Sequence, residues 1–255
     1  GGSDKYNVGL SGEGTALIEV DDNDLNPGNT QDKLNIYGTD DVDRFLFRPD
    51  TILAMLLDSN DEVLGDGSAE RINYDSSIES TVVFGGAGED NFTFDDTSSI
   101  LTVYGGTDDD TFQVGQVFQS PRGALSGLDA GDMFSTTPVT QGHISNGTSF
   151  SASLYGGEGE DNFTVYRNKA ELFLYGEEDN DSFLIRSFVL VDPTDENAPF
   201  TNINGGQGAD FINYAINAPV NIEGGDGIDT VTILGTEFGD DFVIDEKGVY
   251  GAGLY

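Results

Sequence analysis

The motif Gly-Gly-x-Gly-x-Asp-x-apolar recurs along this chain, and no other feature limits its possible folds as much. Four close copies, four looser copies and one fainter echo, at Gly127, are present. Several intervals between copies are 19 or 20 residues, which suits one coil of two short strands and two turns. A fixed period of this length predicts that like segments stack on like. The eight copies begin at Gly38, Gly85, Gly105, Gly156, Gly176, Gly205, Gly224 and Gly235.

Each copy also carries the pattern of a short strand. With positions numbered from the first glycine, positions 8 and 10 are apolar, whereas positions 7 and 9 are mostly polar. This alternation predicts a strand with one buried face. A further apolar residue lies two positions before each motif, so the predicted unit is strand, glycine turn, strand. The position-8 residues are Phe45, Phe92, Phe112, Phe163, Phe183, Ile212, Val231 and Phe242.

Repetition of this unit predicts an all-β fold, namely a parallel β-roll or β-helix solenoid with loop insertions. An antiparallel sandwich of hairpins is the alternative, but self-similarity at a fixed period favours parallel stacking. The predicted organisation is 1–3 as a cloning scar, 4–35 as an N-terminal capping segment, and 36–255 as the solenoid, with insertions near 48–80, 115–150 and 187–202.

The longest interval between copies follows Gly38. A Gly-Asp-Gly sequence begins inside it at Gly65, and Glu70 and Ile72 then fall in register with positions 6 and 8 of the motif. The interval therefore suggests one more coil near Gly65.

Charge excludes several classes of partner. The chain has 47 acidic and 10 basic side chains, a formal net charge of −37. Nucleic acids and anionic membrane surfaces would repel it. Disorder is the simplest reading of so acidic a chain. However, 36% of the residues are hydrophobic, and 17 Phe and 10 Tyr recur periodically. A packed core whose surface charge is neutralised by salt or multivalent cations is therefore expected.

The chain has no cysteine, so disulfides do not stabilise it. Its longest apolar run, residues 52–57, is too short to span a bilayer. The multivalent cation that could best neutralise such a charge is calcium, and free calcium is abundant outside cells and scarce in the cytosol. We therefore expect a secreted or cell-surface location, and we interpret the chain as a segment of a longer protein.

The glycine turn has the composition of a cation site. Glycines at positions 1, 2 and 4 would allow positive φ and expose carbonyl oxygens, and the aspartate at position 6 adds a carboxylate. Two stacked turns could supply the six to eight oxygen atoms that calcium requires. In the copies at Gly38, Gly105 and Gly176 glycine is lost from position 4, and aspartate replaces it each time, as Asp41, Asp108 and Asp179. The alternative is that Gly and Asp simply form tight turns.

The close copies GGAGEDNF, GGEGEDNF, GGQGADFI and GGDGIDTV resemble the haemolysin-type (RTX) calcium-binding repeat. That family occurs in secreted bacterial toxins, enzymes and giant surface adhesins. The resemblance extends discontinuously over residues 36–245 and implies a parallel β-roll whose stacked turns hold several Ca²⁺ ions between them. The family repeats every nine residues, whereas here the alternate half-coil lacks a glycine turn, so calcium is expected mainly along one edge.

The resemblance also implies a set of metal ligands. Asp132, which follows the Gly127 echo, would be a further carboxylate ligand. The implied carboxylates are Asp43, Asp90, Asp108, Asp110, Asp161, Asp179, Asp181, Asp210, Asp229 and Asp240. The implied backbone ligands are Gly85, Gly88, Gly105, Gly156, Gly159, Gly176, Gly205, Gly208, Gly224 and Gly227.

An aromatic residue immediately precedes five of the motifs, one residue away from the inward-facing position. These residues are expected to face outward and could bind sugars or a partner surface. The favoured interpretation is a stacked set of rings covered by the insertion loops. The five residues are Tyr37, Phe84, Tyr104, Tyr155 and Tyr175.

No known catalytic motif accompanies the repeats, and no catalytic residues are assigned. The sequence therefore predicts a non-enzymatic, calcium-binding structural module that folds on calcium binding into a rigid acidic rod for adhesion or surface assembly. The expected partners are calcium, neighbouring repeats of the same long chain, further copies of the module and surface glycans, but not nucleic acid or the membrane interior. A carbohydrate-binding or polysaccharide-modifying β-helix, lyase-like or epimerase-like, is the alternative.

Overall fold

The computed structural model describes residues 2–21, 31–65, 68–123, 128, 132–186, 200–215, 218, 220–235, 240–245 and 248–253. The regular secondary structure of these residues consists of strands, without an α-helix. The all-β prediction is therefore confirmed. Within the same residues there is no helix long and apolar enough to cross a bilayer.

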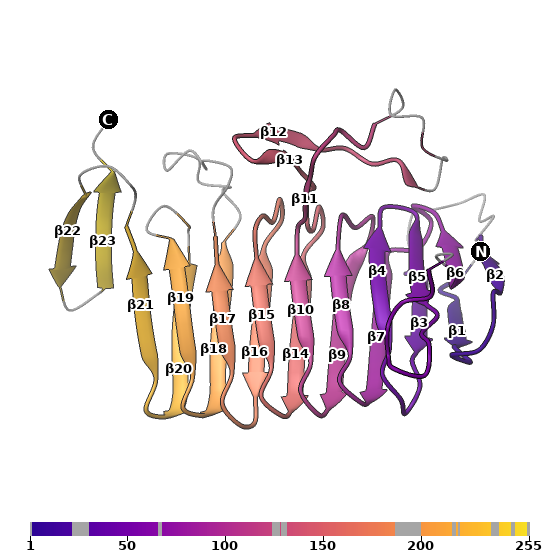
Figure 1. Ribbon diagram of the computed structural model, residues 1–255, viewed down its shortest axis with the longest axis horizontal. Helices are drawn as coiled ribbons and strands as arrows, with labels where there is room; N and C mark the ends of the chain where they lie inside the picture. The colour runs from indigo at the N-terminus through magenta and orange to yellow at the C-terminus, as the bar shows by residue number, and fades with distance from the viewer. Residues whose placement is uncertain are drawn as a thin grey trace.

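Two large sheets run along the length of the molecule (Figure 1). All neighbouring strands of the first sheet are parallel. This eight-stranded sheet has the spatial order β1 (Lys5–Gly9), β3 (Lys33–Tyr37), β7 (Ser80–Ala87), β9 (Ile100–Thr107), β14 (Ala152–Glu158), β16 (Leu172–Glu177), β18 (Thr201–Gly208) and β20 (Val220–Gly227).

The second sheet is parallel from β4 to β21, and the chain alternates between the two sheets. From β3 to β21, a glycine turn joins each strand of the first sheet to the next strand of the second. The preference for parallel over antiparallel pairing is confirmed in these strands. The ten-stranded sheet has the order β2 (Leu17–Val20), β6 (Ala69–Tyr74), β5 (Thr51–Met55), β4 (Arg44–Arg48), β8 (Asn91–Phe94), β10 (Thr111–Val114), β15 (Asn162–Val165), β17 (Ser182–Ile185), β19 (Phe211–Ala215) and β21 (Thr230–Leu234).

The long interval after Gly38 does not form the extra coil that the sequence suggested. Strand β5 runs antiparallel to both β4 and β6, so the interval adds a β5–β6 hairpin to the ten-stranded sheet and no strand to the other. Ile72 is nevertheless fully buried, beside Ile52 of β5 and Ile18 of β2. The buried position was therefore correct, and the strand connectivity was wrong.

Two smaller sheets complete the described strands. The three-stranded sheet comprises β11 (Val117–Phe118), β13 (Gly142–Ile144) and β12 (Thr137–Val139), and it lies beyond the strand ends opposite the glycine turns (Figure 1). Strands β22 (Asp240–Asp245) and β23 (Gly248–Gly253) form an antiparallel pair near the C-terminus.

The core between the two large sheets is a set of stacked side chains. Position-8 phenylalanines of successive strands lie face to face, with ring centroids 4.7–5.2 Å apart from Phe45 to Phe183. The apolar residues two positions before the motifs pack against them, and Val103 and Leu154, for example, are fully buried. Val231, at position 8 of β21, is instead 48% exposed, because no further strand of this sheet covers it among the described residues.

We predict that Phe112→Ala, in the middle of this stack, will destabilise the fold by about 3–5 kcal/mol because it leaves a cavity bordered by two other rings. The free energy of unfolding from chemical denaturation measures the effect. Val231→Ala removes an apolar side chain from the same motif position where it is half exposed, and should cost less than about 1 kcal/mol. Equal losses from the two variants would contradict the assignment of the core.

Candidate functional site

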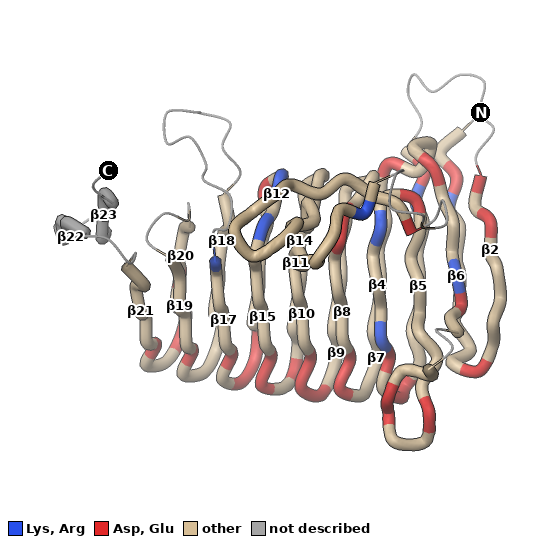
Figure 2. Tube along the Cα trace, turned by 45° about the horizontal axis from the view of Figure 1, so that its top comes forward, with Lys and Arg blue, Asp and Glu red and all other residues tan. Residues whose placement is uncertain are grey.

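The glycine turns stack along one edge of the molecule, where the acidic residues also gather (Figure 2). The pairing register places equivalent motif positions beside one another, because Gly106 of β9 pairs with Gly86 of β7 and with Gly157 of β14. The same alignment continues through Glu177 to Gly206. This edge is the candidate functional site, since seven of the implied aspartates lie on it in a single line that begins at Asp43.

The backbone of the turn is left-handed at two of the three predicted positions. Positions 2 and 4 have positive φ, as in Gly157 (125°) and Gly159 (127°). Asp108 and Asp179 replace glycine at position 4 and keep positive φ, at 79° and 70°. Aspartate tolerates this conformation better than most residues, which explains the substitution. Asp41, the third aspartate at position 4, does not have positive φ.

Position 1 needs glycine for a different reason from the one predicted. Its φ is not positive in any described copy. A Cβ atom on Gly156 would lie only 1.8 Å from Oδ2 of Asp161, in the same motif, and 2.8 Å from the carbonyl oxygen of Gly176 in the next coil. Corresponding clashes occur at Gly85, Gly105, Gly176, Gly205 and Gly224. The first glycine therefore makes room for the position-6 carboxylate and for the neighbouring turn.

The position-6 aspartates form a continuous line that we call the aspartate column. Each backbone N–H donates to Oδ1 of the column aspartate in the following coil, as from Asp110 to Asp161 at 2.7 Å and from Asp161 to Asp181 at 2.8 Å. The last such bond, from Asp210 to Asp229, is 3.2 Å. The column consists of Asp43, Asp90, Asp110, Asp161, Asp181, Asp210 and Asp229.

The second carboxylate oxygen of the column is buried without a partner. At Asp43 this Oδ2 accepts the N–H of Thr39 at 2.7 Å. In the next five members of the column it makes no hydrogen bond with any described residue. Buried polar atoms are normally paired, so five equivalent unpaired oxygens in a line call for a proton or a cation. The five residues are Asp90, Asp110, Asp161, Asp181 and Asp210.

Burial makes these carboxyl groups unusually basic. Removal from water raises the pKa of Asp90, Asp110 and Asp181 to about 8, more than the backbone N–H bonds lower it. It raises the pKa of Asp161 to about 7 and also raises the pKa values of Asp43 and Asp210. Neighbouring carboxylates of the column add to the shift at Asp110 and Asp181. The column therefore resists carrying negative charge on its own.

Side chains at positions 4 and 5 also connect adjacent turns, which the sequence reasoning did not anticipate for position 5. Oδ2 of Asp108 accepts the N–H of Gly88 at 3.0 Å. At position 5, Oδ1 of Asp109 accepts the N–H of Glu160, and Oδ1 of Asn180 accepts the N–H of Ala209, both at 2.8 Å. An acidic or amide residue at position 5 of the copies at Gly105 and Gly176 was the available signal.

Glu70 performs a related role at the first turn. Its carboxylate is buried and accepts the backbone N–H groups of Ser11 at 2.9 Å and Gly12 at 3.0 Å. These residues lie between β1 and β2, at the same edge as the glycine turns. Glu70 thus satisfies turn N–H groups where no column aspartate is available.

Asp132 and Asp240 are the two predicted carboxylate ligands that the structure does not place in a stacked glycine turn. Asp132 forms ion pairs with Arg48 and Arg71 and does not lie in a glycine turn, so its assignment as a ligand was wrong. Asp132 instead contacts Arg48 of β4 and Arg71 of β6, and these ion pairs hold the segment before β12 against the ten-stranded sheet. Asp240 begins β22, but its side chain lies outside the described residues.

The column can hold a cation only with help from the backbone. Among the described residues no group of three or more His, Cys, Asp or Glu side chains converges on one point. Each coil contributes one free carboxylate oxygen, and the remaining ligands would be turn carbonyls such as those of Gly156 and Gly176. Oxygen-only donors of this kind fit hard cations, above all calcium.

Comparisons of the chain with protein-family models, with curated proteins and with solved structures give no match.

We predict that Gly156→Ala will destabilise the fold by more than about 2 kcal/mol, although the φ of this glycine is ordinary, because the new methyl group overlaps Oδ2 of Asp161. Gly9→Ala is the matched control. Gly9 is the last residue of β1, and an added Cβ there would contact nothing within 4 Å. The free energy of unfolding should therefore fall in the first variant and stay nearly unchanged in the second. If both variants were equally stable, the steric explanation for glycine at position 1 would be wrong.

We also predict that the stability of the calcium-free protein falls as pH rises. The column aspartates have folded-state pKa values up to about 8, above the ordinary value of 3.8. Between these values the folded chain binds more protons than the unfolded chain, so deprotonation favours unfolding. Melting temperatures in EDTA from about pH 5 to 8.5, above the pI of 4.1, measure the effect. Asp161→Asn should flatten the slope, and a melting temperature that rises with pH would contradict the account.

Proposed function

We propose that this chain is a calcium-binding structural module of a secreted or cell-surface protein, with a parallel β-solenoid fold. The observation that carries the proposal is the aspartate column, in which five consecutive carboxylate oxygens are buried between stacked glycine turns without a hydrogen-bond partner. The haemolysin-type repeat that the motif resembles binds calcium with the same residue types at the same positions.

Electrostatics supports a cation in the column. One buried carboxylate per coil, in a chain whose formal charge is −37, would leave like charges stacked in a medium of low dielectric constant. Protonation at low pH or cation binding at neutral pH relieves this repulsion. A bound calcium ion would supply two positive charges and would link the carboxylates and carbonyls of adjacent turns.

Calcium fits the turns better than magnesium does. It accepts six to eight oxygen ligands in irregular geometry, whereas magnesium requires a near-ideal octahedron and loses its water reluctantly. Turns that contribute one carboxylate and several carbonyls, such as Gly156 to Asp161, match the first requirement. Extracellular calcium modules typically bind at about 10⁻⁴–10⁻³ M, so such a module would fold after export.

The rest of the architecture supports a mechanical role. Parallel sheets in register, the stacked phenylalanines and the aspartate column all run in the same direction, so each coil contacts mainly its neighbours. A rod of this kind spaces or displays other parts of a long chain and can join further copies end to end. Adhesion and surface assembly are the roles that we propose for it.

Aspartate at position 6 of every copy in the column also has an explanation that does not involve a metal. The bonds from backbone N–H to Oδ1 require an acceptor at position 6 in each coil, whether or not calcium is present. Turn chemistry alone can therefore account for aspartate there. The two explanations differ in what they predict for Oδ2, and calcium dependence separates them.

We predict that calcium at about 1–5 mM raises the melting temperature at pH 7.5 by more than about 10 °C relative to EDTA, because several sites bind only the folded chain. Circular dichroism or scanning calorimetry measures the change. Magnesium at the same concentration should give a much smaller rise. Equal melting temperatures in EDTA and in calcium would contradict calcium binding and would mean that the aspartate column only stabilises the turns through its hydrogen bonds.

The control for this prediction separates discrete sites from diffuse screening. Asp161→Asn removes one column charge while keeping an oxygen acceptor for the N–H of Asp110, and should lower the number of calcium ions bound. Glu62→Gln makes the same chemical change at an exposed residue outside the turns and should not. Calorimetric titration gives both stoichiometries, and an equal decrease in the two variants would indicate screening.

A further inference from the structure

The aromatic residues that precede the motifs form a stack on the outer face of the eight-stranded sheet. Tyr37, Phe84, Tyr104, Tyr155 and Tyr175 lie with ring centroids 4.5–5.3 Å apart and interplanar angles of 7–19°. We call this set the aromatic ladder. The predicted stacking is confirmed, but the predicted cover of insertion loops is wrong for the described residues, because Tyr37 is 41% and Tyr104 38% exposed.

In the aromatic ladder, stacking covers most ring faces, but one face of the ring at the Tyr175 end is open to a groove. Each inner ring has a neighbour on both sides, so it presents only its edge to solvent. At one end Tyr37 faces Gly9, which has no side chain. At the other end Tyr175 pairs with Asn204 of β18, so the aromatic series stops there. No aromatic ring of the described residues covers the face of Tyr175 on that side.

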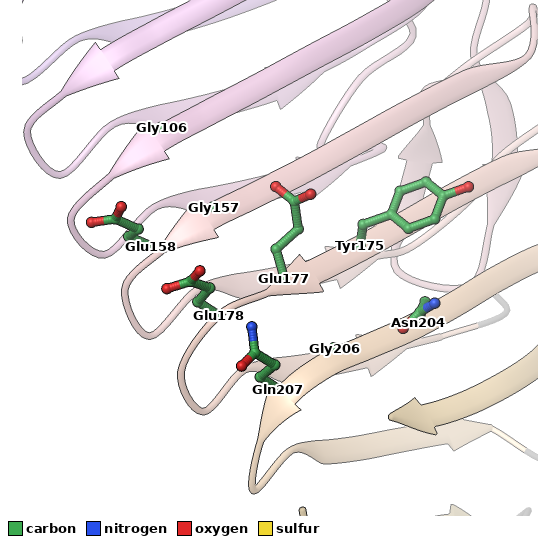
Figure 3. A pocket seen from close by; sticks show the side chains of 9 residues that line it. All are labelled: Gly106, Gly157, Glu158, Tyr175, Glu177, Glu178, Asn204, Gly206 and Gln207. Carbon is green, nitrogen blue, oxygen red and sulfur yellow. The ribbon is translucent and has the colours of Figure 1, made fainter. Parts of the chain in front are cut away.

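A groove opens beside this free ring face. One part, of about 340 Å³, is lined by Phe173, Tyr175, Asn202, Asn204, Asn221 and Glu223. A second part, of about 570 Å³, extends toward the glycine turns and is lined by Glu177, Glu178 and Gln207 as well as Tyr175 and Asn204 (Figure 3). Aromatic surface on one side and amides on the other is a typical composition for a small-molecule site.

Two of the polar groups in the groove are available to a ligand. Among the described residues, the side chains of Asn204 and Gln207 make no hydrogen bond. An amide offers two donors and an acceptor, so each can bond to a hydroxyl group in either direction. Asn221 already donates to Asn202 at 2.8 Å, and this pair forms a fixed wall.

Glu177 is a local exception to the repeat and points to a function for the groove. It occupies position 2, where the neighbouring coils have Gly157 and Gly206, and it has φ of 84°. A glutamate in the left-handed region is strained, and glycine would be the more stable choice. Its side chain stands beside Tyr175 with flat glycine backbone on both sides (Figure 3). Strain of this kind is typically retained at binding sites.

We propose that this groove binds a neutral saccharide, with a pyranose ring against the free face of Tyr175. The C–H face of a sugar ring is apolar and matches an aromatic face, while its hydroxyl groups match the amides of Asn204 and Gln207 and the carboxylate of Glu177. Anionic sugars and nucleic acids are disfavoured, because Glu177, Glu178 and Glu223 line the groove and no lysine or arginine does so among the residues that the structure describes. This proposal concerns a site separate from the aspartate column.

The test uses the whole chain in millimolar calcium, with maltohexaose, cellohexaose and chitohexaose as neutral probes and a galacturonate hexamer as the anionic probe. Saturation-transfer NMR detects binding, and chemical-shift titration gives the affinity. We expect binding of at least one neutral probe and none of the anionic probe. Tyr175→Leu should weaken binding about tenfold, the size of one lost ring-face contact. Tyr104→Leu, whose ring faces are both covered, should leave the affinity unchanged.

Glu177→Gly provides a second measurement that does not depend on loss of structure. This variant should weaken saccharide binding and also raise the melting temperature, by about 2–4 °C, since it relieves the strained φ. The proposal is overturned if no neutral probe binds the folded protein, if the galacturonate binds as tightly, or if neither Tyr175→Leu nor Glu177→Gly changes affinity. A fall in self-association, and not in sugar binding, for Tyr175→Leu would instead identify the face as a contact between copies. The melting behaviour in EDTA reports on the aspartate column independently.

Discussion

The stacked turns depend on one interaction, the hydrogen bond from the backbone N–H of each column aspartate to Oδ1 of the next. It recurs at 2.7–2.8 Å from Asp43 through to Asp210. The bond draws the carboxylate into the turn, and position 1 must then be glycine to leave space for Oδ2, as at Gly156. The glycine at position 1 and the aspartate at position 6 therefore depend on each other and act together in every turn. Because it has the period of one coil, it aligns the strands, the stacked phenylalanines and the aromatic ladder in the same register.

The same interaction buries carboxylate groups, and the cost of burying their charge makes folding depend on the pH and on the cations in solution. The hydrogen bond satisfies Oδ1, while Oδ2 stays buried and unpaired in five consecutive turns. Burial raises the pKa of Asp90, Asp110 and Asp181 to about 8, so the column favours neutralisation by a proton or a cation near physiological pH. An environment rich in calcium would supply that neutralisation, and one without it would not. This is the physical basis for proposing a module that becomes stable outside the cell.

Strict repetition inside the molecule contrasts with variation on its outer face. The interior repeats because each phenylalanine packs against the equivalent residue of the next coil, so a change in one coil disturbs two contacts. The outer face has no such requirement. There the aromatic ladder gives way to Asn204, and Glu177 takes a position that glycine occupies in the adjacent coils. Departures from the repeat that cost stability without improving packing are where a ligand site is expected.

The sequence by itself determined the strands that flank the glycine turns, their parallel pairing and their buried positions. These follow from the two-residue alternation after each motif and from the period of 19–20 residues, which both depend on local spacing. It also placed the aspartates from Asp90 to Asp229 on one edge. Tertiary structure decided the β5–β6 hairpin, the reason for glycine at position 1, the unpaired Oδ2 atoms and the groove at Tyr175. Each of these depends on three-dimensional contacts, either between strands of different coils or, for the first glycine, across a single turn, and local spacing does not encode their direction or distance.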